Sequence, residues 1–168
     1  MRSDTVRSLL RLALLTLVFY LLQSAVFSRL RIWGAAPLLL PLVAVGAGLL
    51  GGGGWGGGAG LAAGLLCDVS LGGQGLTFTV FLTAAGFFAG FLGEFILHRG
   101  FPSYLLLSLG TLVLSAVLQM LRLWLYAHCP LWPLALTGLK QTGYSLLFTI
   151  PAYFCLRRAL QPWLRARM

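Results

Sequence analysis

Few residues of this chain carry groups that can do chemistry, and most of these lie at the ends of apolar stretches. Glu94 and His98 are spaced four apart, which places an acid and a base on one face of a helix. Such a pair either supports the helix locally or forms one step of a proton relay inside a membrane. Because the opposite half of that stretch offers no further polar step, we expect local support.

Asp68 is the other acid that follows a long apolar stretch. A charge at the centre of a bilayer costs at least about 2.5 kcal/mol, so such a group usually has a partner. The topology derived below places Asp68, Arg122 and Lys140 toward the same side of the membrane. We hypothesise that Asp68 pairs with Arg122 or Lys140. The alternative is an interfacial aspartate in water that caps the turn over residues 68–73.

No set of residues with the spacing of a known catalytic or metal site occurs in the chain. It contains no G-x-S-x-G or H-E-x-x-H motif and no paired aspartates within an apolar stretch. The three cysteines, Cys67, Cys129 and Cys155, form no metal-binding spacing. His98 and His128 are expected on opposite sides of the membrane. We therefore expect no enzyme, no cofactor and no metal.

The elements that position these groups follow from composition. Of 168 residues, 59% are hydrophobic and 9% are charged, whereas about a quarter carry charge in soluble domains. At about 20 residues per crossing, the length predicts one all-α membrane domain, a compact bundle of about six transmembrane helices. The expected spans lie near residues 10–28, 36–51, 55–69, 76–97, 103–126 and 138–157. Residues 127–137, with two prolines, predict a loop.

Basic residues predict the orientation. The chain has 12 Lys and Arg against 3 Asp and Glu, a formal charge of +9. With both termini in the cytoplasm, the cytoplasmic side holds Arg2, Arg7, Arg11, Arg99, Arg157, Arg158, Arg165 and Arg167, and the outer side holds Arg29, Arg31 and Lys140. This bias agrees with the positive-inside rule. The basic C-terminal tail is expected to contact anionic lipids, and no nucleic-acid partner is implied.

Small residues recur at intervals of four in the middle of the chain. Gly56, Gly60 and Gly64 fall on one helix stripe, and Gly86 with Gly90 forms a second such pair. In a membrane, stripes of this kind let two helix backbones approach closely. They predict either packing faces between neighbouring spans or a face for a partner's transmembrane helix, and both can hold at once.

The segment from residue 60 to residue 76, with its glycines and Asp68, resembles the rod shape-determining protein MreD family. The chain is also similar to that family in length, in the number of expected spans, in a glutamine late in the first span (Gln23) and in a proline opening the second (Pro37). It departs from the family at Leu38, where relatives often carry Asp or Asn.

The resemblance implies a component of the bacterial cell-elongation machinery in the inner membrane. Implied partners are the bitopic protein MreC, the actin-like MreB, and a SEDS glycosyltransferase with its class B penicillin-binding protein. The implied fold is similar to the six-helix substrate-binding subunits of energy-coupling-factor vitamin transporters.

Three functions are compatible with the sequence. The first is a non-enzymatic membrane scaffold that binds a single-span protein of the MreC type. The second is a small-molecule-binding subunit of a vitamin-type transporter, which needs several convergent polar groups. The third, a lipid-binding or lipid-flipping protein, would use the same groups. The candidates for them are Asp68, Gln74, Gln119, Arg122, Lys140 and Gln141.

Overall fold

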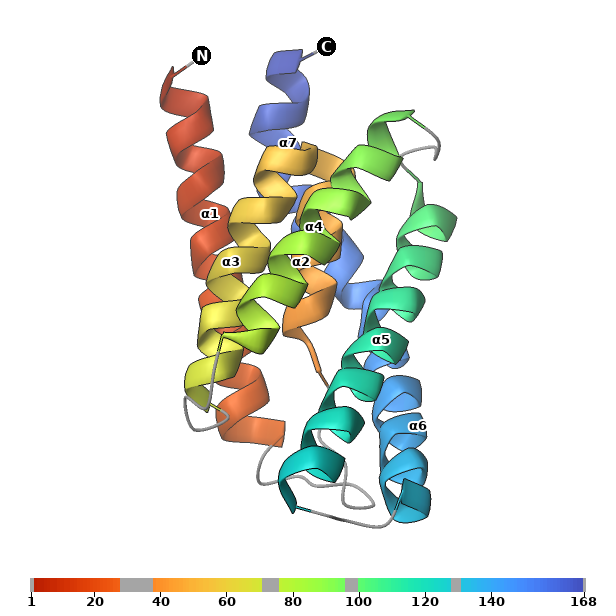
Figure 1. The fold of residues 1–168 in the computed structure, drawn as a ribbon. Coiled ribbons are helices and arrows are strands. Elements are labelled where there is room, and N and C mark those ends of the chain that lie inside the picture. The colour runs from red at the N-terminus through yellow and green to blue at the C-terminus, as the bar shows by residue number, and fades with distance from the viewer. Residues whose placement is uncertain (1, 28–37, 71–75, 96–99, 128–130, 168) are drawn as a thin grey trace.

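The computed structural model describes residues 2–27, 38–70, 76–95, 100–127 and 131–167, and every regular element in these ranges is a helix (Figure 1). The elements are α1 (Arg2–Leu21), its π-helical continuation η1 (Leu22–Phe27), α2 (Leu40–Gly51), α3 (Gly53–Ser70), α4 (Thr77–Phe95), α5 (Phe101–Ala127), α6 (Leu131–Leu147) and α7 (Thr149–Arg167).

Three of the described helical segments are long and apolar enough to cross a membrane: Val6–Ala25, Thr77–Phe95 and Phe101–Leu121. The chain therefore has the composition and helix lengths of an all-helical membrane protein. The first turn of α1 and the last turn of α7 lie at the same end of the bundle (Figure 1).

Prolines mark the beginnings of four of these helices. Pro41, Pro102, Pro133 and Pro151 each lie within the first three residues of α2, α5, α6 and α7. The first turn of a helix does not use its backbone N–H groups internally, so proline costs nothing there, and its fixed φ suits the helix. Farther inside a helix, a proline removes a backbone hydrogen bond and kinks or breaks the helix.

This rule corrects two expectations from the sequence. The loop predicted over residues 127–137 is wrong from Leu131 onward, because Pro133 occupies the first turn of a helix and does not interrupt one. The span expected near 138–157 is divided between α6 and α7 by a turn at Phe148. A continuous helix would place Pro151 in its interior, whereas the turn places it in a first turn.

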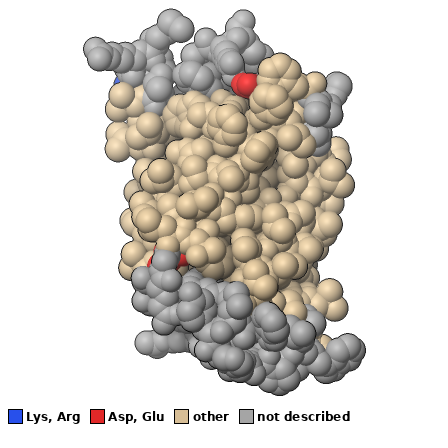
Figure 2. Space-filling view, in the orientation of Figure 1, with Lys and Arg blue, Asp and Glu red and all other residues tan. Residues whose placement is uncertain are grey.

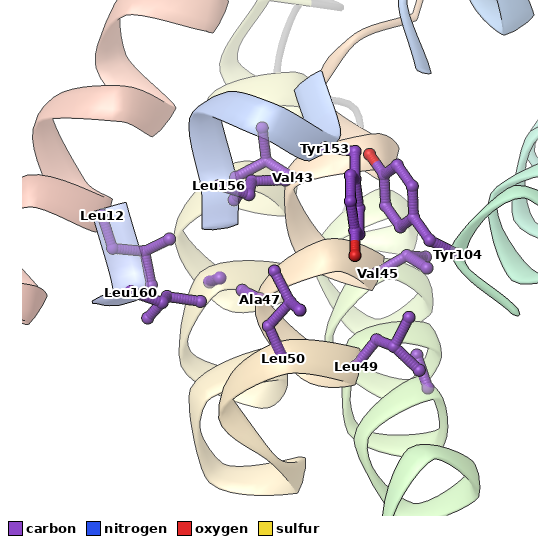
Figure 3. Close-up of a cluster of buried hydrophobic side chains, with 12 residues drawn as sticks. Leu12, Val43, Val45, Ala47, Leu49, Leu50, Tyr104, Tyr153, Leu156 and Leu160 are labelled. Atoms are coloured by element: carbon purple, nitrogen blue, oxygen red, sulfur yellow. The ribbon is translucent and has the colours of Figure 1, made fainter. Parts of the chain in front are cut away.

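Helix α2 forms the centre of the bundle. All of its residues are buried, and it packs against α3, α4, α5 and α7. Leu12 of α1 and Tyr153 and Leu156 of α7 converge on it, together with Tyr104 of α5 (Figure 3). The Tyr104 hydroxyl donates a hydrogen bond of 3.1 Å to the carbonyl of Leu42. The core is therefore assembled around one short helix that meets little solvent or lipid.

The connection from α2 to α3 is a single residue. Gly52 has φ of 99°, a conformation that residues with a side chain rarely adopt, and its N–H donates to the carbonyl of Gly48 at 2.8 Å. Helix α3 then runs back beside α2 (Figure 1). The break falls inside the glycine run, where the sequence predicts it.

The start of α2 is capped by side chains from distant parts of the chain. Gln23 Oε1 accepts hydrogen bonds from the N–H groups of Leu39 at 2.9 Å and Leu40 at 3.4 Å. Ser145 Oγ accepts one from the N–H of Leu38 at 2.9 Å. The first N–H groups of a helix have no internal partner, and a buried helix end has no water to supply one. These two side chains supply the missing acceptors.

The outside of the bundle is apolar. Large apolar side chains are exposed on every outer helix, among them Leu14 (64%), Val80 (68%) and Leu106 (65%). Figure 2 shows one face as an almost uncharged surface, with charged atoms only toward its two ends. An exposed apolar surface of this extent would aggregate in water and is compatible with the hydrocarbon of a bilayer.

We expect Gln23→Leu to destabilise the protein by about 1–3 kcal/mol, because it removes the acceptor of the Leu39 and Leu40 N–H groups at the start of α2. Gln23→Glu keeps an acceptor oxygen and should lose less. Thermal unfolding of the purified protein in detergent measures both. Equal midpoints for Gln23→Leu and the unaltered chain would contradict the capping role.

Candidate functional site

The glycine stripes meet where α3 packs against α4. A side chain added at Gly56 would overlap the carbonyl oxygen of Gly86, and one at Gly86 would overlap the carbonyl of Gly56. A side chain at Gly60 would overlap the carbonyl of Leu82. The two backbones are therefore in direct contact at these positions, a distance that only glycine permits.

The same contact continues toward both ends of the helices. A side chain at Gly64 would overlap the backbone of Thr79, and one at Gly90 would overlap Gly53 at the beginning of α3. Gly48 of α2 likewise abuts the carbonyl of Gly86. Helices α2, α3 and α4 thus form one close-packed unit joined through backbone atoms.

These contacts bear on the two interpretations of the stripes. The faces of Gly56, Gly60 and Gly64 and of Gly86 and Gly90 lie against each other within the chain. A partner's helix cannot reach them while α3 and α4 are packed. A partner surface must therefore be sought on another face.

Asp68 caps the beginning of α4. Its Oδ2 accepts hydrogen bonds from the N–H of Thr79 at 2.8 Å and from the Thr79 hydroxyl at 2.7 Å, and its Oδ1 accepts one from the N–H of Phe78 at 3.2 Å. Only 3% of Asp68 is exposed. A carboxylate at a helix N-terminus is stabilised by the unpaired N–H groups and by the helix dipole. Asp68 therefore fastens the end of α3 to the start of α4.

This geometry decides part of the hypothesis about Asp68. The alternative of an interfacial aspartate in water is wrong in one respect, because the carboxylate is buried and caps α4, whereas the turn over 68–73 lies partly outside the described residues. Lys140 lies exposed on α6, and Arg122 belongs to α5, with its side chain outside the described part of the structure. Pairing of Asp68 with Lys140 or Arg122 stays a prediction.

Glu94 lies exposed in the last turn of α4. It lines a pocket of about 330 Å³ together with the glycine run at residues 51–54 and the rings of Phe87 and Phe91. His98 falls outside the described residues, so the predicted support between Glu94 and His98 stays a prediction.

The sequence does not reveal the capping roles of Gln23 and Ser145. Gln23 is noticeable as an amide within an apolar stretch and as a point of resemblance to the MreD family, but neither signal identifies the N–H groups that it binds. Ser145 carries no comparable signal, because its own hydroxyl also bonds back to the carbonyl of Gln141 at 2.8 Å, as serines in helices commonly do.

The described residues thus define a small helical bundle, apolar outside and joined inside by glycine contacts and side-chain caps. No group of three or more His, Cys, Asp or Glu suited to a metal ion occurs in the part of the chain that the structure describes. Searches of protein-family models, curated proteins and solved structures gave no match to this chain.

Substitution of a glycine in the stripe tests the backbone contact between α3 and α4. We expect Gly86→Ala to destabilise the bundle by about 1–3 kcal/mol, since its methyl group has no room. Gly110→Ala is the matched control, because a side chain there meets nothing within 4 Å. It should be neutral or stabilise by up to about 1 kcal/mol. Unfolding midpoints in detergent measure both, and equal losses would refute the contact.

Substitution of Asp68 separates capping from ion pairing. If capping dominates, Asp68→Leu should cost about 2–4 kcal/mol, because it strands several buried donors. Asp68→Asn retains acceptor capacity and should cost less. Charge reversal, Asp68→Lys, combined with Lys140→Asp or Arg122→Asp measures pairing through unfolding midpoints. Rescue by neither swap would exclude the predicted ion pair.

Proposed function

We propose that this protein is a non-enzymatic membrane scaffold of the bacterial cell-elongation machinery, of the MreD type. In this role it binds a single-span partner of the MreC type and supports peptidoglycan synthesis and cell shape. Through that partner it acts with MreB, a SEDS glycosyltransferase and a class B penicillin-binding protein.

The observation that carries the proposal is the structural role of Asp68, the residue on which the resemblance depends. Its carboxylate is bound by donors of α4 and holds two helices together. Gln23, the other polar residue shared with the family pattern, holds the start of α2. Both residues therefore serve the bundle's shape, which is what a protein that presents fixed surfaces to other membrane proteins requires.

The proposal includes a topology of six crossings. Helix α1 with η1, then α2, α3, α4 and α5 make five passes in alternating direction, and α6 with α7 together make the sixth. This order agrees with the common end of the bundle at which α1 begins and α7 ends (Figure 1). By the positive-inside rule that end is cytoplasmic, in the bacterial inner membrane.

The proposed topology also implies a fold type for the bundle. A six-helix bundle with a short, enclosed second helix is the arrangement that we propose to be similar to the vitamin-binding subunits of energy-coupling-factor transporters. The scaffold differs from them in function, since its polar groups at Asp68, which is buried, and Gln23, which is partly buried, are engaged by helix ends.

Co-purification tests the proposal directly. The affinity-tagged chain, co-expressed with a candidate partner that has one span, a coiled coil and a β-rich outer domain, should retain that partner in mild detergent. A neighbouring reading frame of this architecture is the expected source. Recovery of a vitamin-sized ligand without any single-span protein would refute the scaffold and favour the transporter subunit.

A further inference from the structure

We draw no further inference here: the strongest candidate, the pocket of about 330 Å³ that Glu94 lines beside the glycine run at residues 51–54, carries none, because it rests on the beginning of α3 and on a carboxylate that already has an interaction of its own, and nothing in the described part of the structure points to a ligand.

Discussion

The fold depends on enclosing a short helix whose residues are all buried. Helix α2 has 12 residues and rises about 18 Å, against a hydrocarbon thickness of about 30 Å. Without acceptors from elsewhere in the chain, the backbone N–H groups at its start would be unpaired within the bundle, which destabilises the fold. The amide of Gln23 and the hydroxyl of Ser145 meet this requirement, and they tie η1 and α6 to the centre.

The same constraint explains the other polar contacts of the interior. The first residue of α4 is exposed, but Phe78 after it is buried, and the carboxylate of Asp68 supplies acceptors for the N–H groups of Phe78 and Thr79. Tyr104 and the hydroxyls of Ser115 and Thr142 bond to backbone carbonyls. Most of the polar side chains in the described interior thus serve the backbone of a helix, and few are directed at one another.

Besides these hydrogen bonds, close contact between helices at glycines stabilises the bundle. Since lipid tails give helices no hydrophobic reason to associate, attraction must come from close contact of many atoms. Gly56, Gly60 and Gly86 bring α3 and α4 to backbone contact, and Gly48 brings α2 to the same place. The resulting unit is close-packed on its inner side, whereas Gly54 and Gly58 leave its side toward α1 open.

The sequence by itself determined the class of the protein, the break within the glycine run, and the helices now seen as α3, α4 and α5 to within about two residues at each end, whereas α1 begins eight residues before the predicted span. These follow from hydrophobic length and from glycine's weakness in a helix, which are local properties. It misjudged residues 131–137, because a proline indicates a loop or a helix start equally well until the following turn is known.

Only the tertiary structure decided which groups meet. Spacing placed Gly56, Gly60 and Gly64 on one stripe, but it could not say that α4 and not a partner covers them. Nor could it match Gln23 to the start of α2, or Asp68 to the N–H groups of Phe78 and Thr79. Hydrogen bonds between distant segments depend on how the helices are arranged in three dimensions, and periodicity along one helix contains no record of its neighbours.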